Sequence, residues 1–141
     1  MLATAESCTG GWVAKVITQV SGSSQWFDRG FVTYSNIAKQ EMLAVSAETL
    51  QQHGAVSEAT VREMAVGALR HSHAQVALAI SGIAGPGGGT ADKPVGMVCF
   101  AWATADGPVT AATHRFQGNR DSIRRQAVLT ALEGLLQQLA E

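Results

Sequence analysis

The segment Glu6-Ser7-Cys8-Thr9-Gly10-Gly11 carries the first side chains whose types and spacing suit chemistry, between a short apolar stretch and a helical pattern. In open α/β sheets, ligands collect at the carboxyl ends of strands, where helix N-termini offer free N–H donors to anions. Ser7 is therefore well placed to attack an electrophile or to bind phosphate. The alternative is that Ser7 and Thr9 only cap the helix, because hydroxyl side chains are favoured there. Spacing alone leaves both possibilities open.

A glycine-rich segment, SGIAGPGGGT at Ser81–Thr90, is the second candidate and follows a buried apolar run. Its main-chain N–H groups can converge on one anion, as a phosphate cradle or an oxyanion hole. It is not a Walker A loop, because no Gly-Lys-Ser/Thr follows it, and no helical pattern opens behind it as a dinucleotide fingerprint requires. A flexible hairpin connection is the alternative. Six Gly or Pro residues in eight positions exceed what a connection needs, so we favour a functional loop.

A third set of polar residues, Thr33-Tyr34-Ser35-Asn36, ends a strand pattern and is followed by Lys39. This spacing can place the Tyr34 phenol and the Lys39 amine in one pocket. A lysine becomes a useful base only when burial or other cations lower its pKa. The sequence alone favours a solvated Lys39 on the surface of a helix.

Basic residues open the last helical pattern, in Asn119-Arg120-Asp121 followed by Arg124 and Arg125. Cations at a helix start oppose the helix dipole, so these arginines can serve the anionic group of a ligand. A structural salt bridge to Asp121 accounts equally well for one of them. The sequence does not choose between the two roles.

Alternating strands and helices must position these candidates. The expected strands are Leu2–Ala5, Phe31–Tyr34, Val76–Ile80, Val95–Ala103 and Val109–Phe116. Two expected helices cover residues 12–20 and 38–43, and three more begin at the caps Ser46, Ser57 and Asn119. The helix after Ser46 ends at Gly54, and the helix after Ser57 ends at about Ser72. The last helix is expected to bury Ile123, Ala127, Val128, Ala131, Leu132, Leu135, Leu136 and Leu139. This order predicts an α/β fold, a three-layer α/β/α sandwich with a mixed sheet, in one domain over residues 1–141.

Composition restricts the function classes. The 141 residues are 46% apolar and 15% charged, and the high apolar content excludes a disordered chain. The net charge of −1 offers no excess of basic residues to bind the phosphates of a nucleic acid. We expect no membrane segment and no metal, because glycines interrupt the longest charge-free run and no metal-ligand spacing occurs. Two cysteines and no signal peptide favour a cytoplasmic protein.

Four blocks together resemble the C-terminal domain of the CinA family over essentially the whole chain. They are TAESCTGG, TYSN with a lysine three residues later, SGIAGPGGGT..KPVG and F.GNRD.IRRQAV, in the family's order. The likeness is closest to stand-alone bacterial members that act as nicotinamide-nucleotide amidases. Those members carry a further helix and a full first strand before the first block, so we expect this N-terminal portion to be absent here.

The resemblance implies hydrolysis of nicotinamide mononucleotide to nicotinate mononucleotide and ammonia, without a cofactor, by a homo-oligomer, expected to be a dimer. The implied catalytic residues are Ser7 as nucleophile, Tyr34 and Lys39 as its activating partners, and Ser81. The residues assigned to substrate binding are Glu6, Thr9, Gly10, Asn36, Gly82, Gly85, Gly87, Gly88, Arg120 and Arg124. The alternative function is a non-catalytic nucleotide-binding or regulatory module.

Overall fold

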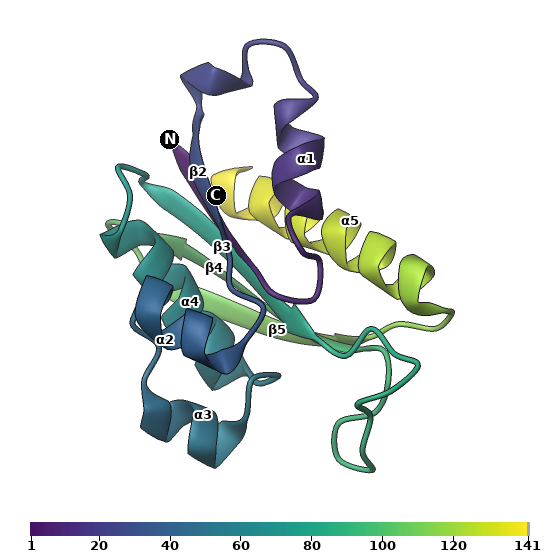
Figure 1. The fold of residues 1–141 in the computed structure, drawn as a ribbon. Helices are drawn as coiled ribbons and strands as arrows, with labels where there is room; N and C mark the ends of the chain where they lie inside the picture. The colour runs from purple at the N-terminus through teal and green to yellow at the C-terminus, as the bar shows by residue number, and fades with distance from the viewer. Residues whose placement is uncertain (141) are drawn as a thin grey trace.

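The computed structural model describes residues 1–140 and contains one five-stranded mixed sheet between two helical layers (Figure 1). The strands are β1 (Leu2–Glu6), β2 (Phe27–Val32), β3 (Val76–Gly82), β4 (Met97–Thr104) and β5 (Val109–Arg115), in the order β2-β1-β3-β4-β5. β1 is parallel to β2 and β3, whereas β4 is antiparallel to β3 and β5. The predicted three-layer α/β/α sandwich with a mixed sheet is confirmed.

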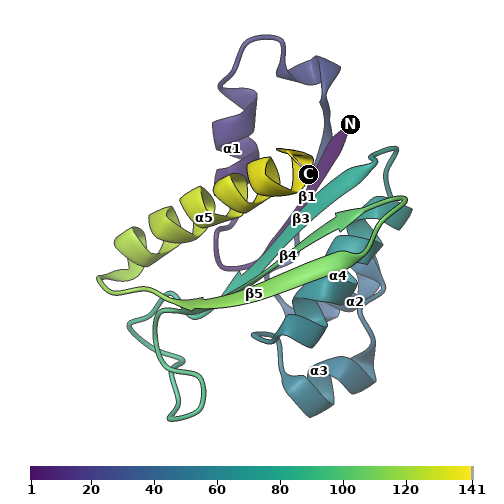
Figure 2. The same ribbon diagram turned by 180° about the vertical axis from the view of Figure 1, so that it is seen from behind.

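Two helices cover one face of the sheet and three cover the other (Figures 1 and 2). The first layer is α1 (Trp12–Thr18) and α5 (Arg120–Ala140). The second is α2 (Asn36–Leu43), α3 (Ala47–His53) and α4 (Glu58–Arg70), and a 3-10 turn at Ser23–Gln25 leads into β2. As expected, the hydroxyls of Ser46 and Ser57 cap α3 and α4 by accepting main-chain N–H groups.

The strands present small residues to one helical layer and large residues to the other. In β3, Ala77 and Ala79 pack towards α4, while Leu78 and Ile80 pack towards α5. Small side chains let α4 lie close to the sheet, and α4 in turn lies close to α2. A Cβ at Gly67 of α4 would sit 2.0 Å from the Leu43 carbonyl oxygen, so only glycine permits this approach. The packing fixes the position of α2, the helix that carries Lys39.

The second strand begins earlier than its sequence pattern predicts. β2 covers Phe27–Val32 rather than Phe31–Tyr34, because main-chain pairing with β1 recruits the polar Asp28-Arg29 pair at an exposed sheet edge. Tyr34 therefore lies beyond the strand, in the segment that leads into α2. The Ser35 hydroxyl caps that helix by accepting the Ala38 N–H at 3.1 Å.

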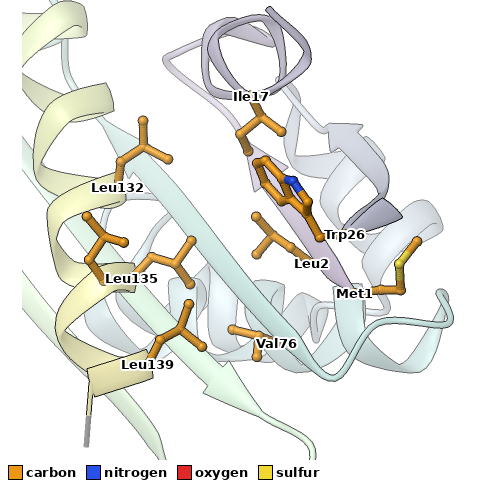
Figure 3. Close-up of a pocket in the computed structure, with 9 residues that line it drawn as sticks. Met1, Leu2, Ile17, Trp26, Val76, Leu132, Leu135 and Leu139 are labelled. Carbon is orange, nitrogen blue, oxygen red and sulfur yellow. The ribbon is translucent and has the colours of Figure 1, made fainter. Parts of the chain in front are cut away.

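The buried stripe of α5 is shorter than predicted. Leu136 and Leu139 are 68% and 58% exposed, and Leu132 is only partly buried. The residues of α5 that are buried as expected are Ile123, Ala127, Val128, Ala131 and Leu135. Leu136 and Leu139 line an apolar groove together with residues at the start of β1. Figure 3 shows Leu139 on the side of this groove formed by α5.

The part of the chain that the structure describes, residues 1–140, lacks two other kinds of feature. No helix there is long and apolar enough to cross a membrane. No cluster of three or more His, Cys, Asp or Glu side chains in the same range is arranged to hold a metal ion.

Candidate active site

A polar cavity of about 240 Å³ lies at the carboxyl ends of the parallel strands. Ser7 follows β1, Tyr34 follows β2, Ser81 and Gly82 end β3, Lys39 comes from α2 and Arg120 begins α5; together with Cys8, Ala55, Val56 and Ala84 they line it. Open α/β sheets bind ligands at this edge. The structure thus brings together all four predicted catalytic residues and two of those assigned to substrate binding, Gly82 and Arg120.

Ser7 and Lys39 form the chemical centre of the cavity. The Lys39 Nζ atom lies 2.9 Å from the Ser7 Oγ atom, 2.9 Å from the Thr33 carbonyl oxygen and 3.1 Å from the Tyr34 carbonyl oxygen. An ammonium group donates to all three acceptors, whereas a neutral amine keeps a lone pair that can accept the Ser7 hydroxyl proton. The main chain of Ser7 is fixed by its N–H, which donates to the Ile80 carbonyl of β3 at 3.0 Å.

The side chain of Lys39 is buried, contrary to the solvated position favoured by sequence alone. Only 1% of the residue is exposed, and burial lowers the pKa of its ammonium group below the usual value. No carboxylate neutralises it, since the one salt bridge within residues 1–140 joins Arg29 to Asp28. The adjacent Cys8 thiol is a poor competitor for the nucleophile's role, because burial raises its pKa to about 11.

The Tyr34 side chain does not take the position expected of an activating partner. Its contacts with Ser7 and Lys39 come from the main-chain carbonyl oxygen. The residue is 63% exposed, and the phenol oxygen accepts a hydrogen bond from Arg120 Nη2 at 3.4 Å. Because the chain turns outward after β2, the carbonyl faces inward and the phenol lies at the rim with Arg120.

Arg120 joins the two loops that flank the cavity. Its Nη1 atom donates to the Gly85 carbonyl oxygen at 2.8 Å, while Nη2 donates to the Tyr34 phenol oxygen. No salt bridge to Asp121 forms within the described part of the chain. The guanidinium is therefore a cation without a neighbouring counter-charge, at the rim of a cavity that holds a second cation, Lys39.

Glu6 and Thr9, both assigned to substrate binding, lie outside the cavity lining and serve the fold. Glu6 is 1% exposed, and its carboxylate accepts the Thr9 hydroxyl at 2.6 Å and the N–H groups of Val13 and Ala14 at 2.9 and 3.1 Å. The N-cap residue of α1, Gly11, has no side chain to cap the helix, and the Glu6 carboxylate accepts the N–H groups of Val13 and Ala14 instead. Their assignment to substrate binding stays a prediction, and the contacts of both side chains are those of a buried helix cap.

Gly10 and Arg124 also lie outside the cavity lining. They line a separate hollow with Gly11, Trp12 and Lys15. Gly10 has a positive φ of 58°, which shapes the turn after Ser7, and the Arg124 guanidinium binds carbonyl oxygens of that turn. Their assignment to substrate binding stays a prediction, and the contacts of Arg124 are with this turn.

Other assignments fall beside the cavity rather than in it. Asn36 is the exposed first residue of α2, and Gly87 and Gly88 are exposed in the glycine-rich loop. Gly85 contributes its carbonyl to Arg120. Four lining residues were not predicted: Cys8, Ala84, and the pair Ala55 and Val56 in the turn before α4. The available signal for Ala55 and Val56 was their position as an apolar pair between the end of α3 and the Ser57 cap of α4.

Comparisons with known proteins identify the family of the chain. Residues 1–139 match the family described as CinA C-terminal domain. The nicotinamide-nucleotide amidohydrolase PncC of Escherichia coli strain K12 is 61% identical over 138 residues, which cover 98% of this chain and 84% of that protein. A CinA-like protein of Syntrophobacter fumaroxidans is 53% identical over 131 residues, covering 93% of this chain and 31% of that longer protein.

A solved structure shows the same fold at high similarity. The competence/damage inducible protein CihA from Agrobacterium tumefaciens has a TM-score of 0.95 and 52% sequence identity, over 96% of this chain and 83% of that chain. A family match over nearly every residue, with a relative that is 61% identical over 84% of its length, leaves one assignment. The chain belongs to the CinA C-terminal domain family.

Proposed function

We propose that this chain is a nicotinamide-nucleotide amidohydrolase that converts nicotinamide mononucleotide to nicotinate mononucleotide and ammonia, as part of pyridine-nucleotide recycling. The observation that carries the proposal is the buried Lys39 amine, 2.9 Å from the Ser7 hydroxyl in a cavity rimmed by Arg120. The names of relatives at 51–61% identity support the substrate class.

The first half of the reaction uses Lys39 as the base. The neutral amine takes the Ser7 proton while Oγ attacks the carboxamide carbon, and the carbonyl oxygen becomes an oxyanion. Main-chain N–H groups around the cavity, including those of the glycine-rich loop, are the donors that would stabilise this charge. As the intermediate collapses, the Lys39 ammonium returns its proton to the leaving nitrogen, which departs as ammonia and leaves a nicotinate ester on Ser7.

The second half repeats the proton movements with water. Lys39 takes a proton from a water molecule as the water oxygen attacks the ester carbon. Collapse of this intermediate returns the proton to Ser7 Oγ and releases the nicotinate nucleotide. A lysine with a lowered pKa suits both halves, because it must bind and release a proton near neutral pH.

Tyr34 and Arg120 act at the rim in this mechanism. The Tyr34 carbonyl oxygen, with that of Thr33, holds Lys39 in place. The Arg120 guanidinium binds the nucleotide phosphate, since an arginine presents paired donors to an anion. The protein is proposed to work in the cytoplasm, supported by two free buried cysteines, and as a homodimer, supported by the exposed leucines of α5.

The test is ammonia release from nicotinamide mononucleotide by the purified chain, with free nicotinamide and the dinucleotide as comparison substrates. Rapid release from the mononucleotide that is lost in Ser7→Ala supports the proposal. Tight binding of the mononucleotide without ammonia release contradicts it and favours the non-catalytic nucleotide-binding module.

A further inference from the structure

The turn that carries Ser7 is held by a guanidinium from the far end of the chain. The Nε atom of Arg124 donates to the Cys8 carbonyl oxygen at 3.0 Å, and its Nη2 atom donates to the Thr9 carbonyl oxygen at 3.3 Å. Cys8 and Thr9 are the two residues that follow Ser7, and 116 residues separate Cys8 from Arg124. The nucleophile's turn is thereby tied directly to α5.

Three features keep the Arg124 side chain in this position. Its guanidinium lies over the Trp12 ring, with Cζ 5.5 Å from the ring centroid. Arg124 forms no salt bridge within the described residues that would draw it away. A Cβ at Gly10 would lie 3.3 Å from Nη2, so a larger residue would crowd the guanidinium. Stacking, hydrogen bonding and the small neighbour together fix one orientation.

The opposite side of the same turn is held by Glu6. The Glu6 carboxylate accepts the Thr9 hydroxyl and the first N–H groups of α1, and it is buried. An anion thus binds the donors of the turn while the Arg124 cation binds its carbonyl oxygens. With both ends restrained, the Ser7 Oγ atom has little freedom to leave the Lys39 amine.

We propose that Arg124 is a positioning residue that holds the Ser7 turn in its reactive geometry and does not bind the nucleotide. The effect expected on turnover of nicotinamide mononucleotide rests on the proposed function. The effect expected on the reactivity of Ser7 does not. Loss of the two hydrogen bonds lets the turn relax, and a displacement of about 1 Å at the reacting atoms can cost about a hundredfold in rate.

The experiment compares Arg124→Gln, Arg124→Lys and the control Arg125→Gln, which removes the same charge from an exposed position of α5. One measurement is the kcat and KM for nicotinamide mononucleotide. The other is the second-order rate of Ser7 labelling by a small organofluorophosphonate, which carries neither a nucleotide nor a carboxamide. The labelling rate reports the reactivity of Ser7 whether or not the mononucleotide is the substrate.

We expect Arg124→Gln to lower kcat and the labelling rate together, by about tenfold to a hundredfold, with KM changed less than about threefold. Arg124→Lys should recover part of both losses, because the ammonium keeps the charge but not the fork or the stacking. Arg125→Gln should match the wild type in both measurements. Thermal melting of each variant identifies loss of folding, and Arg124→Lys decides the question if Arg124→Gln does not fold.

Two results would overturn the proposal. A raised KM with an unchanged labelling rate would make Arg124 a substrate-binding residue. Unchanged kcat and labelling in a folded Arg124→Gln would remove any role in positioning. If the wild type labels at Ser7 but releases no ammonia, the proposed function fails while the positioning of Ser7 is still measured by labelling.

Discussion

Two hollows lie at opposite ends of the parallel strands, and they differ in every property that matters for chemistry. The cavity at the carboxyl ends holds a hydroxyl, a buried amine and a guanidinium in about 240 Å³. The apolar groove at the other end, about 450 Å³, is lined by Met1, Leu2, Ile17, Trp26, Val76, Leu132, Leu135, Leu136 and Leu139 (Figure 3). The larger hollow offers no acid, base or nucleophile among these residues.

The volume of a hollow therefore does not identify the reactive site of this molecule. What distinguishes the smaller cavity is a cation removed from water and held against a nucleophile by main-chain carbonyl oxygens. Such a group is costly to bury unless hydrogen bonds compensate it, so its presence marks a functional arrangement. The groove is lined by apolar side chains, and the packing of such side chains explains it.

The largest expected effect is at Ser7, the proposed nucleophile, which lines the polar cavity and not the groove. Ser7→Ala should lower kcat by at least about a thousandfold, while the affinity for the nucleotide stays within about tenfold of the wild type. The reason is that Oγ bonds to the substrate carbon in the transition state and not in the bound ground state. Steady-state ammonia release and calorimetric binding of the mononucleotide measure the two quantities. A variant that keeps a tenth of wild-type turnover would show that Ser7 is not the nucleophile.

Removing the buried amine should give the next largest effect. Lys39→Met should lower kcat by about a hundredfold or more, with part of the loss recovered as pH rises and hydroxide replaces the base. The pH–rate profile of ammonia release measures this, with the exposed Lys15→Met as the matched control. A pH-independent loss in a protein that melts at lower temperature would indicate a packing role instead.

The same variant tests the burial of Lys39 through stability. The folded chain has a Lys39 pKa below the ordinary value of 10.5, so between these two values the unfolded chain binds more protons. The free energy of unfolding should therefore rise with pH in that window. Denaturant unfolding at several pH values should show this contribution in the wild type and not in Lys39→Met; equal pH dependence in both would contradict it.

The sequence was sufficient for most of the fold because most elements carry their own signal. Alternation and apolar runs marked the strands, and Ser46 and Ser57 marked two helix starts that the structure confirms. The edge strand was misplaced because Asp28 and Arg29 have low strand propensity and are recruited only by pairing with β1.

The site was less predictable because its decisive contacts join distant segments. The Lys39 amine contacts the nearby Thr33 and Tyr34 carbonyl oxygens, but its partner hydroxyl belongs to Ser7, 32 positions earlier in the chain. Arg120 and Arg124 are one helical turn apart and look equivalent, yet one faces the cavity and the other binds the turn after Ser7. Only the tertiary structure distinguishes their roles.

Arg120 should determine how the cavity recognises the nucleotide rather than how fast it reacts. We expect the wild type to prefer the mononucleotide over its riboside by about a hundredfold in kcat/KM, since charge-assisted hydrogen bonds are worth about 1.5–3 kcal/mol each. Arg120→Gln should reduce that preference to about tenfold or less while the riboside reacts at an unchanged rate. Equal kinetics of the wild type on both substrates would contradict a phosphate site at the rim.

The smallest effect is expected at the groove, where two adjacent leucines form a matched pair. Leu135 is 7% exposed and Leu136 is 68% exposed. Leu135→Ala should lower the free energy of unfolding by about 2–5 kcal/mol, because it leaves a cavity in the core, whereas Leu136→Ala should change it by less than about 0.5 kcal/mol. Neither variant should change the kcat of the folded protein, since the groove and the Ser7 turn lie at opposite ends of β1. Denaturant unfolding and ammonia release check both statements, and a folded Leu136→Ala with impaired turnover would show that the two hollows are coupled.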